Sequence, residues 1–484
     1  MNGNKVLKLH MGPAKCALDL GDGSERGEYV NQDYILNKLG RPHRAISLMY
    51  CYYPHDEKWP QRASEAYVND GTGAWGYPYD DYFTYKGSLL KGDLSDEPFK
   101  YMREVRSHGQ DVLLTLTIDP KVEDEHIVSI ARDLRTFGRV MLRINHEATG
   151  NWFSFNKRAT YEELSDFFSR CCEIIHKEAP NVKVILCLDG FKDPSEEKMD
   201  KEDIFTPAIK AADIESVDRY LALHWGWPFD VALKGGNSFA RYSVNKIYEC
   251  TKKSYHRYNE INGEARPMVL SELNADGDVT GAYDQAEMME AFCNKLKNDD
   301  ENWLSGFTMY QMRDRGRLGL EIEDPNNKDV GIEQPLMDSY KKLLFDEFFY
   351  PSMEIKEEAT LPATLRWGGS EDADGLAVNM HFEASPVFCE AYFEDELKDE
   401  NLMMEINGRW FYKAPGVGCI DFMPAFYHNK SDGARDMTLK IFAPPASGEN
   451  DPSQGDDWQM NYYREIKSLP RIRVEYKPVV ETLD

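Results

Sequence analysis

Residues 140–153 read VMLRINHEATGNWF, a strand-like run that ends in a histidine and a glutamate. Apolar side chains alternate with basic or polar ones over Val140–Asn145, which is the pattern of a β-strand. Arg143 lies four residues before Glu147, so the period-2 alternation of a strand places both on one face. A buried arginine in a central strand is costly without a partner. The stretch therefore predicts a buried strand whose arginine keeps a neighbouring carboxylate ionised; an incidental glutamate capping the next helix is the alternative.

Similar runs recur through residues 1–350, with amphipathic segments between them. Short runs rich in Val, Ile and Leu are typical of buried parallel strands. The predicted strands are Val6–His10 or the stretch near Cys16–Leu20, then Ala45–Tyr52, Val112–Thr117, Val140–Asn145, Val182–Leu188, Tyr220–His224, Met268–Glu272 and Gly306–Gln311. The predicted helices are Tyr34–Leu39, Glu97–Ser107, Asp124–Phe137, Thr160–Glu178, Thr206–Ala212, Tyr242–Tyr258, Tyr283–Lys297 and Glu333–Phe348. Thr160 and Glu163 have the spacing of a capping box at the start of the fourth helix.

Strands that alternate with helices in this number predict an α/β fold, a closed (β/α)8 TIM barrel. A doubly wound sheet is the alternative, but it would carry a glycine-rich phosphate loop after its first strand, and the sequence has none there. The long segment 54–91 is rich in Tyr, Trp, Gly and Asp and follows the second strand. In a barrel it would lie at the active-site face.

The pattern changes after about residue 350. Short alternating runs such as Leu376–Phe382 and Thr438–Phe442 are separated by clusters of turn residues, which predicts an all-β sandwich. We therefore expect two domains, a catalytic barrel over 1–350 and an accessory β-sandwich over 351–484. The aromatic residues Trp367, Trp410, Phe411, Tyr412 and Trp458 fit either a carbohydrate-binding surface or, more simply, the core of the sandwich.

Charge and cysteine content limit the partners and the compartment. The formal net charge is −27, which disfavours binding to nucleic acid or to anionic membranes and is compatible with a neutral polysaccharide or oligosaccharide. The nine cysteines form no CxxC pair and are expected to be buried thiols. Together with the lack of an apolar h-region in Met1–Pro13, they slightly favour the cytoplasm. A trimmed signal peptide would instead make the protein secreted. The pattern predicts no oligomeric state.

Two glutamates follow predicted strands on opposite sides of the barrel. Glu147 ends the fourth strand, and Glu272 ends the seventh, in RPMVLSELN over residues 266–274. Hydrolysis of a glycosidic bond requires two carboxyl groups on opposite sides of that bond. Placing Glu147 against the aromatic pair Trp152 and Phe153 would desolvate it and raise its pKa, as a general acid requires. Glu272 would then be the nucleophile, about 5–5.5 Å from Glu147 in a retaining enzyme.

The run R-x-x-H-E-x-x-G-x-W-F resembles the acid/base signature of glycoside hydrolase family 26, a family of clan A barrel glycosidases. Its matching residues here are Arg143, His146, Glu147, Gly150, Trp152 and Phe153. The resemblance covers roughly residues 1–350. It implies a retaining, β-mannanase-type or related β-glycanase activity with Glu147 as acid/base and Glu272 as nucleophile, and it implies no metal or organic cofactor.

Further substrate-binding residues are expected near the two glutamates. Beyond His146, Arg143 and Trp152, they are His224 and Trp225 at the end of the predicted sixth strand and Tyr310 at the end of the eighth. The clan usually places a tyrosine on strand six that hydrogen-bonds the nucleophile; His224 or Trp225 replaces it here, or the tyrosine comes from elsewhere. Weaker candidates are Asp119, for which a turn before Pro120 is favoured, and the aromatic residues Tyr52, Tyr53, Trp59, Trp75 and Tyr77 with His55.

The sequence therefore predicts a retaining glycoside hydrolase that cleaves β-linked polysaccharide or oligosaccharide by double displacement. A β-glucanase or a β-xylanase of the same clan is the alternative within this chemistry. A carbohydrate-binding barrel without activity is the alternative from another class. An aldolase is disfavoured because no lysine ends a predicted strand.

Overall fold

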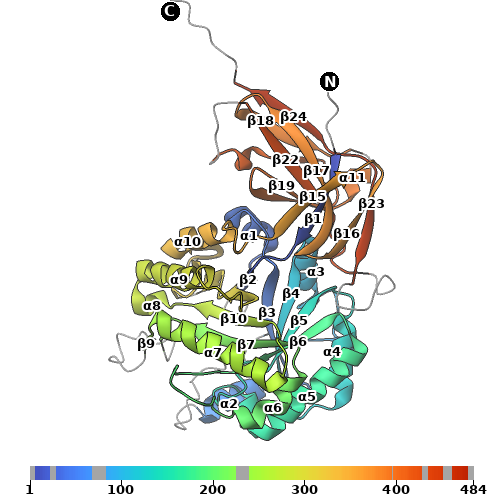
Figure 1. Cartoon of the computed structure of the whole chain (residues 1–484). Helices are drawn as coiled ribbons and strands as arrows, with labels where there is room; N and C mark the ends of the chain where they lie inside the picture. Colours follow the sequence, from blue (N-terminus) through green and yellow to red (C-terminus); the bar gives the residue numbers. More distant parts are fainter. Residues whose placement is uncertain are drawn as a thin grey trace, which may run out of the picture.

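The computed structural model describes residues 6–21, 29–67, 83–224, 239–314, 316–394, 396–427, 434–450 and 460–477 (Figure 1). Eight parallel strands close into a barrel, which confirms the predicted fold class. In order around the barrel they are β2 (Ala17–Gly21), β3 (Ala45–Tyr52), β4 (Asp111–Ile118), β5 (Val140–Ile144), β6 (Val182–Cys187), β7 (Ile214–Tyr220), β10 (Met268–Asn274) and β11 (Gly306–Met309). Pairing of β11 with β2 closes the ring.

Helices surround the barrel (Figure 1). They are α1 (Gln32–Leu39), α2 (Trp59–Tyr67), α3 (Phe99–Ser107), α4 (Asp124–Leu134), α5 (Tyr161–Glu178), α6 (Glu202–Ala211), α7 (Val244–Asn262), α8 (Gly277–Thr280), α9 (Ala282–Lys297) and α10 (Pro335–Leu344). The predicted capping box is present at the start of α5: Thr160 Oγ1 accepts from the Glu163 amide at 3.2 Å, and the Glu163 carboxylate accepts from the Thr160 amide at 2.8 Å. Leu164, Phe167 and Cys171 bury one face of this helix.

The predicted sixth strand, Tyr220–His224, is wrong in its position. The barrel strand is β7, Ile214–Tyr220, which reads IESVDRY and lacks the apolar run of a buried parallel strand. His224 lies instead on β8 (Ala222–His224), which pairs antiparallel with β9 (Phe239–Arg241) outside the barrel. Tyr220 is therefore the last residue of its strand and not the first, which places it at the mouth of the barrel.

Antiparallel sheets form the C-terminal region, as predicted. The larger one contains β1 (Val6–Gly12), β15 (Ser352–Glu358), β16 (Ala363–Gly369), β17 (Asp372–Phe382), β19 (Leu402–Ile406), β20 (Arg409–Lys413), β22 (Arg435–Phe442) and β23 (Tyr462–Ile466). A second consists of β18 (Pro386–Tyr392), β21 (Cys419–Asp421) and β24 (Arg471–Tyr476), and α11 (Glu396–Asp399) follows β18. A small sheet beside the barrel is formed by β12 (Arg313–Asp314), β13 (Glu321–Asp324) and β14 (Asn327–Glu333).

The N-terminal strand β1 pairs with β15 and β17, so this sheet joins β1 to strands from beyond residue 350. Of the two predicted first strands, the stretch near Cys16–Leu20 is the one in the barrel. A division at residue 350 into a catalytic barrel and an accessory domain remains a proposal. Strand β1 lies before residue 350 in the sequence but pairs with strands that follow it.

The two antiparallel sheets of the C-terminal region, which include β1 and are called the β-region below, pack against the N-terminal ends of the barrel strands (Figure 1). Ser370 Oγ donates to the carbonyl of Arg44, directly before β3, at 2.6 Å. The Asn450 amide donates to the carbonyl of Thr136, shortly before β5, at 2.7 Å. This contact leaves the C-terminal ends of the strands, where active sites of barrel enzymes lie, on the opposite side.

Core packing accounts for three of the five aromatic residues singled out in the β-region, whereas Tyr412 is partly buried and packs on His108 with ring centroids 3.7 Å apart. Trp367, Trp410 and Phe411 are buried, and Trp410 stacks on Phe442 with ring centroids 5.7 Å apart. Trp458 lies outside the described residues. These buried rings cannot form an exposed platform for sugar rings.

All nine cysteines are free, and Cys419 is the exposed one among them. The expectation of buried thiols is thus met at the other eight positions. Within the described ranges, no helix has both the length and the apolar character needed to cross a membrane.

Candidate active site

The chain turns sharply directly after β5, between Asn145 and Glu147. Asn145 and Glu147 both have left-handed backbone conformations, with φ of 49° and 51°. The Asn145 side chain holds the turn by accepting from the Ile118 amide at 2.7 Å and donating to the Ile118 carbonyl at 3.0 Å. A glutamate in this conformation costs about 1–3 kcal/mol, and such strain concentrates at functional sites. Glu147 therefore lies at the C-terminal end of its barrel strand, the face where active sites of barrel enzymes lie.

Trp152 binds the Glu147 carboxylate directly. Its Nε1 donates to Glu147 Oε2 at 2.7 Å. A side chain at Gly150 could not be accommodated, because its Cβ would lie 2.6 Å from a ring carbon of Trp152. Burial raises the pKa of Glu147 well above its usual range, the charges of Asp218, Glu272 and Asp189 raise it further, and the Trp152 hydrogen bond opposes them. Glu147 thus holds its proton at a pH where an ordinary glutamate is ionised.

Arg143 occupies the centre of the barrel mouth and has no exposed side-chain surface. Its Nε donates to Thr115 Oγ1 at 2.8 Å, and its Nη1 lies 3.0 and 3.1 Å from the two oxygens of Asp218. Its Nη2 donates to Glu272 Oε1 at 2.8 Å. One buried guanidinium therefore compensates the buried carboxylates of Asp218 and Glu272. The sequence predicts one such carboxylate partner for Arg143.

Glu272 receives a second hydrogen bond through its other oxygen, from the hydroxyl of Tyr220. Both oxygens of Glu272 are thus held by donors from two other barrel strands, Arg143 of β5 and Tyr220 of β7, which fixes the orientation of the carboxylate. Asp218 is paired with Glu272 across β7 and β10. Burial and the charge of Glu272 raise the pKa of Asp218, and Arg143 opposes them.

Of the possibilities left open for the sixth strand, Tyr220 is the tyrosine that contacts Glu272. His224 is the last residue of β8, and Trp225 lies outside the described residues. Asp218 and Tyr220 were both missed as site residues by sequence reasoning. Their spacing of two residues, which places them on one face of a strand, was the available signal.

His146 is buried and packs on Phe153 with ring centroids 4.3 Å apart. Burial, followed by the charge of Arg143, lowers the pKa of His146 well below its usual range, so its ring is neutral. Tyr310, at the end of β11, meets Tyr220 edge to face at 5.9 Å. The structure thus places Tyr310 beside the residue that holds Glu272, and substrate contacts of His146, Trp152, His224 and Tyr310 remain predictions.

The loop after β3 contacts the loop after Glu147. Tyr53 and Ser154 share a hydrogen bond of 2.6 Å between their hydroxyls, and Trp59 Nε1 donates to the Ser154 carbonyl at 3.0 Å. Asp119 caps a turn, as favoured from the sequence, by accepting from the Lys121 amide at 3.1 Å, and it also pairs with Arg158. Trp75 and Tyr77 lie outside the described residues.

Neither a protein-family model nor a curated protein sequence matches the chain. Solved structures match with 9–12% identity. A family 26 β-mannanase from Bacteroides ovatus has 12% identity over 69% of this chain and 90% of its own, with a TM-score of 0.40. The catalytic domain of a family 26 endo-β-1,4-mannanase from a Bacillus species has 11% identity over 69% and 87%, with a TM-score of 0.45. A family 51 α-L-arabinofuranosidase from Bifidobacterium longum has 9% identity over 90% and 97%, with a TM-score of 0.41.

Proposed function

We propose that the protein is a retaining glycoside hydrolase. The observation that carries this proposal is that two carboxyl groups, at the ends of the fourth and seventh barrel strands, have different surroundings. Glu147 lies in a setting that favours its protonated form, whereas Glu272 accepts hydrogen bonds from Arg143 and Tyr220 through its two oxygens. A retaining glycosidase needs one acid and one nucleophile of this kind.

In the proposed reaction, Glu147 donates its proton to the oxygen of the leaving sugar while Glu272 attacks the anomeric carbon. The glycosidic bond breaks, and an ester forms between the sugar and Glu272. Glu147, now a carboxylate, then takes a proton from water as the water attacks the same carbon. The ester bond breaks, Glu272 is regenerated, and the configuration of the sugar is retained.

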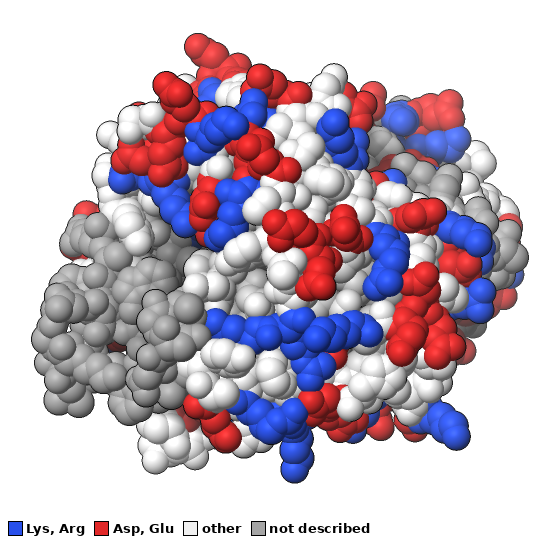
Figure 2. Space-filling view, turned by 90° about the horizontal axis from the view of Figure 1, so that it is seen from below, with Lys and Arg blue, Asp and Glu red and all other residues white. Residues whose placement is uncertain are grey.

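The proposed substrate is a β-linked polysaccharide or oligosaccharide, with β-mannan first and β-glucan or β-xylan as alternatives. The motif from Arg143 to Phe153 supports mannan. The net charge of −27 and the interspersed acidic and basic side chains on the face opposite the β-region favour an uncharged ligand (Figure 2). A binding barrel without activity is the competing function.

Product analysis on mannan, xylan, mixed-linkage glucan and β-1,3-glucan tests this proposal. We expect release of oligosaccharides from one of these β-glycans, with the β-configuration retained when the reaction is followed by proton NMR. If the configuration of the sugar were inverted, the reaction could not proceed through an ester between the sugar and Glu272. Binding without hydrolysis of any glycan or activated aryl β-glycoside would favour the competing function.

Replacing Glu147 with glutamine should lower kcat/KM on a natural glycan by about 10³-fold, because the leaving oxygen loses its proton donor. On a dinitrophenyl glycoside, whose leaving group needs no proton, the rate of the first step should fall far less. The wild-type rate should fall as pH rises through the raised pKa of Glu147, since the acid is active when protonated. The variant should lack this alkaline limb.

Glu173→Gln is the matched control, because Glu173 is an exposed residue of α5. It should retain the wild-type rate and pH profile. An unchanged alkaline limb in Glu147→Gln would assign the acid to another residue.

A further inference from the structure

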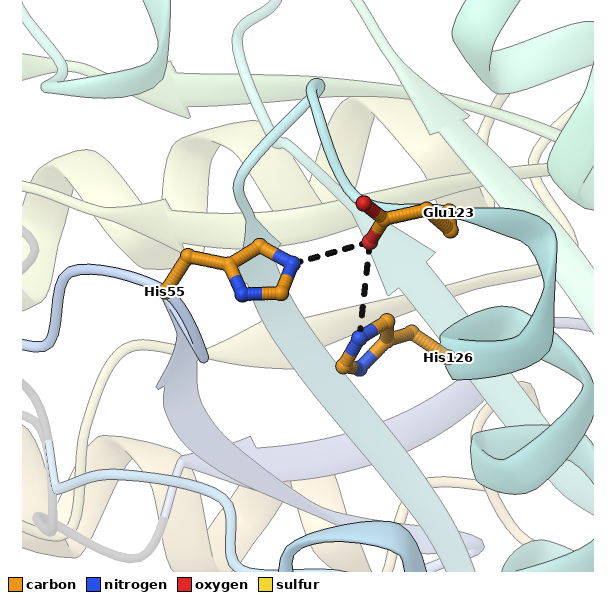
Figure 3. Close-up of side chains that lie close together, drawn as sticks. All are labelled: His55, Glu123 and His126. Atoms are coloured by element: carbon orange, nitrogen blue, oxygen red, sulfur yellow. Dashed lines mark hydrogen bonds and ion pairs between the residues drawn. The ribbon is translucent and has the colours of Figure 1, made fainter.

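Two histidines and a glutamate meet at the rim of the barrel, apart from the Glu147 and Glu272 carboxylates. His55 lies three residues beyond the end of β3, Glu123 is the N-cap of α4, and His126 is in the first turn of that helix. Their side chains point toward one another (Figure 3). One potential ligand atom from each lies within 4.8 Å of the other two.

The separations suit a small ion bound by all three side chains. Glu123 Oε2 lies 2.8 Å from His55 Nε2 and 3.6 Å from His126 Nε2. A tetrahedral Zn²⁺ with bonds of about 2.1 Å separates its ligands by about 3.4 Å. His55 is an exposed side chain on a loop, so a small shift of its ring can bring all three ligand atoms to about this separation.

The ring of His126 is already oriented for this purpose. Its Nδ1 lies 2.6 Å from the hydroxyl of Tyr52, the last residue of β3, and its Nε2 faces Glu123. A metal-binding histidine typically donates through its other ring nitrogen to a second group, which fixes the tautomer. His126 is buried, whereas His55 and Glu123 are exposed, so an ion can enter from solvent and retain a water ligand.

We propose that His55, Glu123 and His126 bind a divalent ion of the Zn²⁺ type. Two imidazoles and one carboxylate form a donor set that suits Zn²⁺, whereas Ca²⁺ and Mg²⁺ prefer oxygen ligands. Sequence reasoning missed this site, although the Glu-x-x-His spacing at a helix start places Glu123 and His126 on one face.

The ion would fasten the loop after β3 to α4. The same loop reaches the segment that follows Glu147, through the 3.0 Å bond from Trp59 to Ser154 and a 2.6 Å ion pair between Asp56 and Arg158. The site is therefore structural: the ion stabilises one wall of the barrel mouth. It takes no part in the proposed hydrolysis.

Calorimetric titration of the chelator-treated full chain with Zn²⁺ tests the proposal. Cys419→Ser serves as the background throughout, because its exposed thiol could bind zinc by itself. We expect one Zn²⁺ per chain, a higher Tm with Zn²⁺ than without, and visible absorption bands of four-coordinate Co²⁺ when that ion is used instead. His55→Ala should weaken binding by about 100-fold or more, and Tyr52→Phe by about 10–100-fold.

His381→Ala is the matched control, since His381 is also exposed and hydrogen-bonded to a carboxylate, that of Asp436. It should bind Zn²⁺ like the background protein. Binding that His55→Ala and Glu123→Gln leave unchanged, or no stoichiometric binding at all, would overturn the proposal. Both residues are exposed, so these variants should fold. Glu272→Ala should bind Zn²⁺ normally, which separates this inference from the proposed function.

Discussion

Turnover of a β-glycan should fall by about 10⁴-fold or more when Glu272 is replaced with alanine. The proposed reaction forms a bond between Glu272 and the sugar, and alanine offers no atom to form it. The hydroxyl of Tyr220 and Nη2 of Arg143, which hold the two oxygens of this carboxylate, would lose that acceptor. Initial rates on the preferred glycan, measured with enough enzyme to detect the residual activity, give the ratio.

Chemical rescue makes this test specific. Azide or formate should enter the space left by the Glu272 side chain and attack an activated aryl β-glycoside. With azide, the product should be the glycosyl azide of inverted configuration, because one displacement replaces two. Glu173→Ala, an exposed position on α5, should keep full activity. Activity of Glu272→Ala above trace level, without an added anion, would remove Glu272 from its assigned role.

The apolar barrel strands could be predicted from sequence because their burial is continuous. All eight residues of β3 and all seven of β10 are buried, which requires uninterrupted runs of side chains that tolerate the core. The alternation of such strands with amphipathic helices is sufficient to predict a barrel. No such run marks β7, in which Glu215, Asp218 and Arg219 occupy buried positions.

The charges of β7 are balanced by groups that are distant in sequence. Asp218 is paired with Arg143 from β5, and Arg219 donates to the carbonyls of Asp189 and Phe191 at 2.8 and 3.1 Å. A local pattern contains no information on such partners. The predicted strand therefore began at Tyr220, six residues after the true start at Ile214. That shift hid Asp218 and Tyr220 from the site prediction. Glu147 and Glu272 escaped this error because the first follows, and the second lies in, a strand whose residues are largely apolar.

The cluster of His55, Glu123 and His126 was unpredictable for the same reason. Glu123 and His126 are neighbours on one helix, but His55 comes from the loop of another strand. Pairing of β3 with β4 brings the two segments together.

Arg143→Met should destabilise the folded protein by about 3–5 kcal/mol, measured by urea unfolding. The methionine matches much of the length of the arginine but leaves Asp218 and Glu272 buried without their cation, which is the costly case for a buried ion pair. Because Arg143 opposes the rise in the pKa of Asp218, its removal should raise that pKa further. A raised folded-state pKa contributes stability that is lost as pH rises through it. The difference between variant and wild type should therefore be larger at pH 8 than at pH 5.

The double variant Arg143→Met/Asp218→Asn separates charge from packing. Asparagine keeps the shape of Asp218 and removes one uncompensated charge, so it should recover part of the loss, with a coupling energy of about 1–3 kcal/mol between the two sites. Activity should remain low in both variants, because Glu272 has lost the donor that fixes one of its oxygens. Additive effects of the two substitutions, or equal destabilisation at pH 5 and pH 8, would show that Arg143 acts through packing and not as the shared counter-ion of the two carboxylates.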